Sequence, residues 1–166
     1  MSNRALIEKT FEEGQGIFRL FPIFVPRPFG KAGHRLKLHP DDYYAYGLTR
    51  GSIKERWFSS TISAQNGPDA APDEGMSYVS VSPDSDVRFT LKEAVDELGE
   101  ALIGRELMEK YGGWPMYSKF FDYENPLFHH VHLMFEDAAR VGKLGKPESY
   151  YFPPQLNNYA GEMNAT

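Results

Sequence analysis

The segment that decides the expected fold covers residues 113–133 and reads GWPMYSKFFDYENPLFHHVHL. Residues 115–121 and 127–133 are rich in aromatic and other apolar residues. The polar stretch between them, residues 122–126, contains the Asp, Asn and Pro that favour a turn. We therefore expect two strands joined by a turn, with the second strand carrying three of the chain's five histidines.

Similar strand-like runs recur along the chain, separated by turns and loops. Pro22 interrupts the first of them and Pro26 closes it, which predicts an edge strand or two short strands. Many short strands with few helices predict a mainly β domain with a few helices, folded as a β-sandwich or barrel. The further runs cover residues 17–25, 54–63, 77–81 and 149–152, and the long loop rich in Gly, Pro and Asp covers residues 65–75.

Helical signals are confined to two places. Thr90 followed by Glu93 is a capping box, and apolar residues at helical spacing follow it, so a helix is predicted over residues 91–103. Residues 2–13 mix apolar and charged residues and end at Gly14, which predicts a short amphipathic helix.

Composition excludes several classes of protein. The chain has 166 residues, no cysteine and a net charge of -5. Without cysteine, any metal must be held by imidazole and carboxylate, and the acidic balance gives no basic surface for nucleic acid. No run is long and apolar enough for a membrane helix, and the first residues lack the apolar centre of a signal peptide. These features predict a soluble, cytoplasmic chain that binds neither nucleic acid nor membrane.

The histidine-rich run offers a candidate metal site. In an extended chain His130 and His132 project from one face and His129 from the other. Glu148 opens the next strand-like run and would face the same point if the two strands met in a sheet. Two His and one Glu are a ligand set that catalytic zinc uses. The same residues are also compatible with surface or core histidines and a solvated carboxylate at a turn, which is the commoner situation for such residues.

Two further groups of residues carry charge near these runs. Lys119 interrupts an otherwise apolar strand, so it either points into the sheet beside an acidic partner or points outward as a solubilising charge. His39 stands in the sequence His-Pro-Asp-Asp, residues 39–42, close to His34. This second cluster is interpreted as turn chemistry, because Pro fixes φ and Asp caps the following turn, whereas the neighbouring Arg35 would repel a cation.

Three segments in order resemble the core of the class I mannose-6-phosphate isomerases, which are zinc enzymes of the cupin superfamily. The matching features are a strand with a lysine, a turn ending near Pro-Leu followed by a pair of metal-ligand positions, and a Gly-Lys-Pro-Glu run that opens the next strand. Residues 52–60 also resemble the family's Gly-Glu-x-Trp strand. The segments cover residues 113–122, 125–132 and 142–151.

The resemblance assigns roles by position. His132 and Glu148 match zinc ligands, His130 stands where the family has a glutamine ligand, and Lys119 matches an active-site lysine. Histidine in that position is compatible with zinc, iron or manganese. Phe128 replaces a serine that often faces the family's substrate, and the family's fourth ligand lies beyond Thr166. The chain is thus expected to be a single cupin-like domain, residues 1–166, or the amino-terminal part of a larger protein with an incomplete barrel.

Two functions follow from the resemblance. The first is a metal-dependent aldose–ketose isomerase that converts mannose 6-phosphate to fructose 6-phosphate, or acts on a related sugar, by proton transfer through a metal-stabilised cis-enediol. The second is a non-catalytic cupin-type module that binds a sugar or a metal, or acts as a sensor.

Overall fold

The computed structural model describes residues 2–154, and the secondary structure in it is mixed. Helices make up 29% of the chain and strands 16%, arranged with small antiparallel sheets that do not close into a barrel within these residues. The expectation of a mainly β domain is therefore corrected to a mixed α/β one. The physical reason is that several strand-like runs have no partner strand, while helices also form where the helical pattern is weaker.

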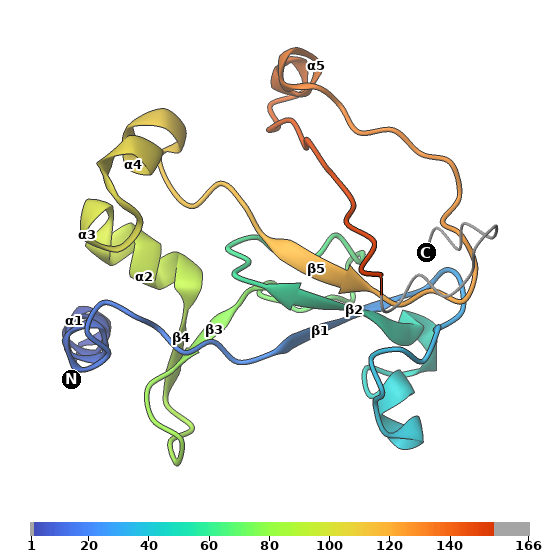
Figure 1. Ribbon diagram of the computed structural model, residues 1–166, viewed down its shortest axis with the longest axis horizontal. Coiled ribbons are helices and arrows are strands. Elements are labelled where there is room, and N and C mark those ends of the chain that lie inside the picture. The colour runs from blue at the N-terminus through green and yellow to red at the C-terminus, as the bar shows by residue number, and fades with distance from the viewer. Residues whose placement is uncertain (1, 155–166) are drawn as a thin grey trace.

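The larger sheet positions the polar residues of the molecule (Figure 1). It is antiparallel, with the order β1-β2-β5, so β2 (Ser52–Phe58) lies between β1 (Ile23–Arg27) and β5 (Ser118–Phe121). In register, Glu55 faces Val25 on one side and Phe121 on the other. Because side chains alternate along a strand, Glu55 and Trp57 share one face of β2.

Pro26 lies inside β1 rather than after it. The register of β1 against β2 shifts between Val25 and Pro26, and β1 is an edge strand of this sheet. A proline has no amide hydrogen for the ladder, so edge strands and bulges are where a sheet accepts it. The predicted edge strand is confirmed, but its end falls at Arg27.

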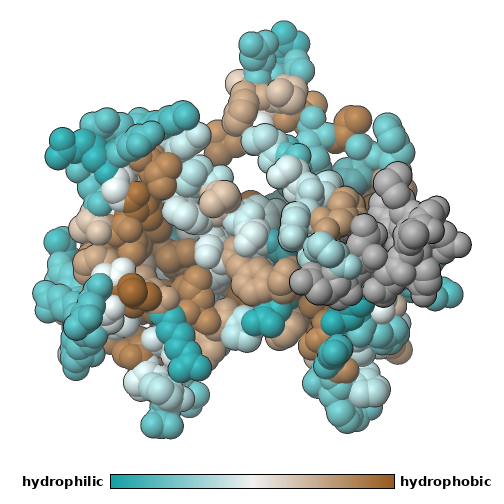
Figure 2. All heavy atoms as spheres, in the orientation of Figure 1, coloured by the Kyte–Doolittle hydropathy of each residue, from teal (hydrophilic) through white to brown (hydrophobic). Residues whose placement is uncertain are grey.

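Helices and a second, two-stranded sheet form the other part of the molecule, at the left in Figure 1. There β3 (Tyr78–Ser80) pairs with β4 (Arg88–Thr90), and α1 (Asn3–Glu13) packs beside α2 (Leu91–Leu98). Hydrophobic spheres gather between these helices in Figure 2. The buried residues of this cluster are Ile7, Val79, Phe89 and Ala94.

The helix over residues 91–103 is confirmed in its start and corrected in its middle. The capping box is present, with the Thr90 side chain accepting from the Glu93 amide and the Glu93 side chain accepting from the Thr90 amide. Gly99 then adopts a φ of 49° and separates α2 from α3 (Glu100–Ile103). The left-handed conformation is accessible to glycine at little cost, and it turns the chain there. A further helix, α4 (Arg105–Tyr111), was not predicted.

The strands expected at residues 127–133 and 149–152 are wrong, because neither run forms a strand. Both runs are extended, and α5 (Phe135–Arg140) lies between them, away from the sheet (Figure 1). The β-type composition of residues 127–133 favours an extended backbone, but a strand also requires a hydrogen-bonding neighbour. Two 3-10 helices, η1 (Pro40–Tyr44) and η2 (Leu48–Arg50), lie between β1 and β2 along the chain.

No helix within residues 2–154 is long and apolar enough to cross a membrane.

Candidate functional site

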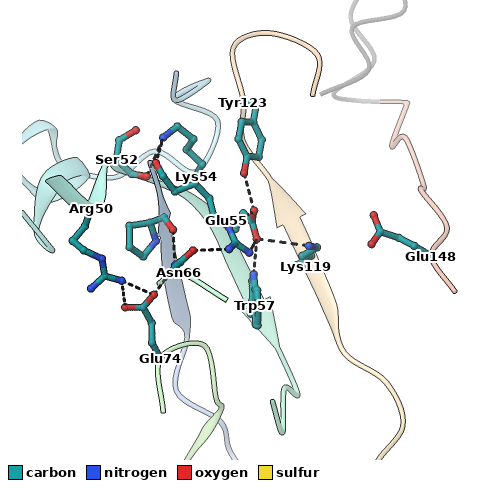
Figure 3. A network of polar contacts seen from close by, with 12 residues as sticks. Arg50, Ser52, Lys54, Glu55, Trp57, Asn66, Glu74, Lys119, Tyr123 and Glu148 are labelled. Atoms are coloured by element: carbon teal, nitrogen blue, oxygen red, sulfur yellow. Dashed lines mark hydrogen bonds and ion pairs between the residues drawn. The ribbon is translucent and has the colours of Figure 1, made fainter. Parts of the chain in front are cut away.

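A buried carboxylate on β2 is the centre of the candidate site (Figure 3). The Glu55 side chain is 2% exposed. Arg27 donates to both of its oxygens, from Nε at 2.8 Å and from a terminal nitrogen at 3.0 Å. Trp57 Nε1 donates at 2.8 Å and the Tyr123 hydroxyl at 2.7 Å. A buried charge is tolerated only when it is paired and hydrogen-bonded, and Glu55 meets both conditions.

The pKa of Glu55 reflects two opposing effects. Burial raises it, but the hydrogen bonds and charge of Arg27, followed by the charge of Lys119, outweigh burial. The pKa therefore lies below its ordinary value, and Glu55 is an anion at neutral pH. In turn, burial and the neighbouring Glu55 anion raise the pKa of Tyr123, which keeps its hydroxyl a hydrogen-bond donor.

Lys119 points into the sheet, which resolves the two orientations that the sequence left open. It lies opposite Trp57 in the register of β5 on β2, and its ammonium is 3.7 Å from Glu55 Oε2. The side chain is 13% exposed, and the ammonium lies 4.2 Å from the centre of the Phe121 ring. Burial lowers the pKa of Lys119, although the Glu55 carboxylate counteracts it.

A chain of polar contacts continues from Glu55 through Arg27 to the loop beside the sheet (Figure 3). Arg27 donates to Asn66 Oδ1 at 2.6 Å, and the Asn66 amide nitrogen donates to Glu74 at 2.6 Å. Glu74 accepts two hydrogen bonds from Arg50, at 2.6 and 2.9 Å. The long loop predicted over residues 65–75 is confirmed, and it supplies both Asn66 and Glu74.

The predicted metal ligands lie together although the strands expected to carry them are absent. The ring centres of His130 and His132 are 5.1 Å apart. His132 Nε2 lies 3.5 Å from Glu148 Oε2. Lys146 reaches the same two atoms, at 2.8 Å from Glu148 Oε2 and 3.3 Å from His132 Nε2. The extended conformation alone thus puts His130 and His132 side by side.

The electrostatics of this group favour a charged Glu148 and a neutral His132. Burial raises the pKa of Glu148, but contacts with the Lys146 ammonium and the Tyr150 hydroxyl bring it down to about 2. Burial and the Lys146 charge lower the pKa of His132. Burial and the bound carboxylate raise the pKa of Tyr150 to about 12, so its hydroxyl remains a donor.

One cavity of about 210 Å³ lies between the residues around Glu55 and the residues around Glu148. We call Arg27, Glu55, Lys119 and Tyr123 the sheet wall. His130, Lys146, Glu148 and Tyr150 form the outer wall. Three cations and two carboxylates line the cavity, together with aromatic rings. The cavity is smaller than the 300 to 1,000 Å³ or so typical of pockets for drug-sized ligands, so it has room only for a small molecule.

The donor set suits zinc, but its present arrangement does not. Two imidazoles and a carboxylate are ligands that a catalytic zinc site uses. His130 Nδ1 lies 2.8 Å from the Phe128 carbonyl oxygen, which leaves Nε2 as the nitrogen available to a metal. As they stand, however, residues 2–154 contain no group of three His, Asp or Glu side chains placed to hold an ion. The Lys146 ammonium contacts both His132 Nε2 and Glu148 Oε2, so it would have to move before a metal bound there.

The second histidine cluster has the structural role expected of it. His39 precedes η1, its ring nitrogen accepts from the Asp41 amide, and Pro40 opens the turn. His34 packs against the Tyr43 ring instead. This cluster is therefore turn chemistry, as the sequence predicted.

Sequence reasoning did not single out the sheet wall beyond Lys119. Glu55 and Trp57 were noted only as part of a strand that resembles a family motif, and Arg27 and Tyr123 were not considered. The signal available was a carboxylate two residues from a tryptophan in a strand that proved buried on both sides of the sheet. The partner residues lie 28 and 68 positions away, so local sequence did not indicate them.

Comparisons with protein-family models, with curated proteins and with solved structures find no match to the chain. A functional assignment therefore depends on the chemistry of the cavity itself.

Proposed function

We propose that the chain carries the sugar-binding part of a metal-dependent aldose–ketose isomerase of the cupin type, similar to the class I mannose-6-phosphate isomerases. The single observation that carries the proposal is that Lys119, His130 and Glu148 line one cavity, while His132 lies beside His130 and Glu148. These four were selected from sequence order alone, and they lie up to 29 positions apart. A cytoplasmic location and a monosaccharide or sugar phosphate as the partner belong to the same proposal.

The walls of the cavity suit a sugar. Aromatic rings line it, and Phe121 and Tyr150 stack with their centres 5.6 Å apart. Such rings pack against the apolar face of a pyranose, while charged side chains receive its hydroxyl groups. The excess of cations over carboxylates favours a ligand with negative charge, either a phosphate or an oxygen that becomes anionic during reaction.

Lys119 is the group best suited to hold or move a proton. Burial lowers the pKa of Lys119 and so raises the fraction of neutral amine at neutral pH. A general base works best when its pKa lies near the operating pH. Glu55, at 3.7 Å, keeps the ammonium at the cavity. Lys119 would then exchange a proton with the sugar carbon or oxygen beside it.

A metal ion, when bound, supplies a Lewis acid that polarises the sugar carbonyl. His130, His132 and Glu148 are the residues that would hold it. Zinc is the first expectation, with iron or manganese as alternatives that the same donors accept.

The test combines metal content with activity on the whole chain. Purified protein is analysed for zinc, iron and manganese, and is then assayed with mannose 6-phosphate and with unphosphorylated mannose. His132→Ala is expected to lose metal and activity together. His129→Ala is the matched control, because this neighbouring histidine is exposed and is not one of the proposed ligands, whereas His132 lies 3.5 Å from Glu148. Metal binding that is equal in both variants would contradict the assigned ligands.

A second function is favoured by one specific observation, the contact of the Lys146 ammonium with both His132 and Glu148. An ammonium there balances the charge of the carboxylate without a metal, which suits a non-catalytic module that binds a sugar. In the same experiment, sugar binding by metal-free protein without turnover would favour this module over the isomerase.

A further inference from the structure

Asn66 lies outside the cavity, yet it contacts the side chain that orients the buried carboxylate. Its Oδ1 accepts from Arg27 at 2.6 Å, while its amide nitrogen donates to the Pro26 carbonyl at 2.9 Å and to Glu74 at 2.6 Å. A side-chain amide has one acceptor and two donor hydrogens, so these contacts use all of its hydrogen-bonding groups. Asn66 is thereby fixed between β1 and the loop that carries Glu74.

Arg27 connects Asn66 to Glu55 in a rigid geometry. The guanidinium is planar, and it uses Nε and one terminal nitrogen for Glu55 and the other terminal nitrogen for Asn66. Rotation of the guanidinium away from Asn66 would therefore also break its two parallel bonds to Glu55. The Arg27 side chain is only 12% exposed, so water gives little replacement for a lost partner.

Glu55 in turn holds the groups that face the cavity. Lys119, Tyr123 and Trp57 all contact its two oxygens. A displacement of the carboxylate would move the Lys119 ammonium, because Glu55 is its nearest anion among the described residues.

We propose that Asn66 is a positioning residue for the cavity: by holding Arg27 it fixes the Glu55 carboxylate, and through Glu55 it sets where Lys119 stands. Only the expected effect of Asn66 on turnover rests on the proposed function. The positional part concerns Asn66, Arg27 and Glu55 alone, so it is measurable in the absence of any substrate.

The two tryptophans provide the direct measurement. Trp57 Nε1 donates to Glu55, whereas Trp114 Nε1 is buried with no hydrogen-bond partner among the described residues. The chain has only these 2 tryptophans, so its NMR spectrum contains two indole N–H signals. The Trp57 signal reports the position of the carboxylate, and the Trp114 signal is an internal reference. Their assignment comes from Trp114→Phe.

Asn66→Ala is expected to shift the Trp57 signal upfield as its hydrogen bond weakens, and to leave the Trp114 signal in place. Asn3→Ala is the matched control, because that amide bonds to Glu93 on the exposed surface, and it should move neither signal. An unchanged Trp57 signal in folded Asn66→Ala would overturn the proposal. If this variant does not fold, Asn66→Ser replaces it, since a serine hydroxyl is too short to reach Arg27.

Asn66→Asp distinguishes two roles of Asn66, namely holding Arg27 in position and fixing the loop to β1. Aspartate keeps an oxygen for Arg27 but loses the amide hydrogens that bond to Pro26 and Glu74. It is combined with Glu74→Ala, because two carboxylates would otherwise repel each other at this contact, and Glu74→Ala alone is the reference. Positioning through Arg27 predicts a Trp57 signal close to that of the reference. A shift as large as in Asn66→Ala would show that Asn66 only ties down the loop, and it would overturn the proposal.

The turnover measurement completes the test. With mannose 6-phosphate, Asn66→Ala is expected to lower kcat by about 10- to 100-fold with little change in KM, because a displaced reacting group affects the chemical step. If the unsubstituted protein shows no isomerase activity, the proposed function fails while the NMR result still decides the role of Asn66. A moved Trp57 signal with unchanged kcat would overturn the link from Glu55 to Lys119.

Discussion

The two walls of the cavity hold similar chemical groups in different ways. In the sheet wall, Glu55 is 2% exposed and every neighbour is fixed on a paired strand or directly after one. Glu148 in the outer wall and His132 beside it are 16% and 32% exposed, on extended segments that pair with no strand among the described residues. The difference teaches that the fold preorganises one side of the site, whereas local ion contacts shape the other.

The largest effect should come from emptying the centre of the sheet wall. Glu55→Ala leaves Arg27 and Lys119 buried without their carboxylate, and removing one partner of a buried pair costs about 3 to 5 kcal/mol. Urea unfolding measures the loss. Glu124→Ala is the control, because its contact with Lys31 is exposed and 3.8 Å long, and it should cost less than about 1 kcal/mol. Similar losses in both variants would erase the contrast between buried and exposed pairs.

Acid should loosen the sheet wall next. The pKa of Glu55 is lower in the folded chain than its ordinary value of 4.5. A carboxylate with a lowered pKa adds stability that is present above pH 4.5 or so and is lost as pH falls through the folded pKa. The free energy of unfolding should therefore decline below pH 4.5.

Glu55→Gln is the matched variant for the acid measurement, since it cannot titrate at this position. Other carboxylates with lowered pKa, such as Glu93 and Glu148, titrate in both proteins. The slope with pH should thus become shallower in the variant without vanishing. An identical slope would mean that Glu55 does not contribute to the acid response.

One substitution made in both walls gives a direct comparison of intermediate size. Tyr123→Phe removes a buried hydroxyl that donates to a charged Glu55, which should cost about 1.5 to 3 kcal/mol. Tyr150→Phe removes a hydroxyl that contacts Glu148 from a ring that is 46% exposed, so water replaces it and the cost should stay below about 1 kcal/mol. Thermal and urea unfolding of both variants test the order. A larger cost at Tyr150 would reverse our ranking of the walls.

The smallest effect on stability is expected for Lys146→Met in the outer wall. The Lys146 side chain is 42% exposed, so its pair with Glu148 should contribute less than about 1 kcal/mol. Zinc affinity should rise about tenfold at the same time, since a positive charge leaves the neighbourhood of the donors. Lys143→Met, three positions earlier and fully outside the cavity, is the control. Titration calorimetry with zinc measures both, and equal affinities would place the metal elsewhere.

Local signals in the sequence predicted the elements that depend on neighbouring residues. The capping box at Thr90 and Glu93, the end of α1 before Gly14 and the loop over residues 65–75 all need only a few adjacent positions. Residues 127–133 were predicted to be a strand for the same kind of reason. That prediction failed because strand formation depends on a distant partner, which composition does not reveal.

The candidate site likewise combines residues that local sequence indicates with residues that only long-range pairing brings together. His130 and His132 were expected side by side from the alternation of an extended chain, and alternation does not require a sheet. Glu148 and Lys119 were expected nearby from the order of motifs. The sheet wall was not foreseen because Arg27, Glu55 and Tyr123 meet only after β1, β2 and β5 have paired. The ion contact of Lys146 also depends on how the two extended segments approach each other.

The long sequence separations within the sheet wall also bear on how fast the protein unfolds. Glu55 bonds to residues 28 and 68 positions away, so large loops must close before these contacts form. We expect these contacts to be made after the folding transition state, so that losing them mainly accelerates unfolding. The network around the Glu55 carboxylate is thus expected to slow unfolding more than it speeds folding, and so to set the lifetime of the native state.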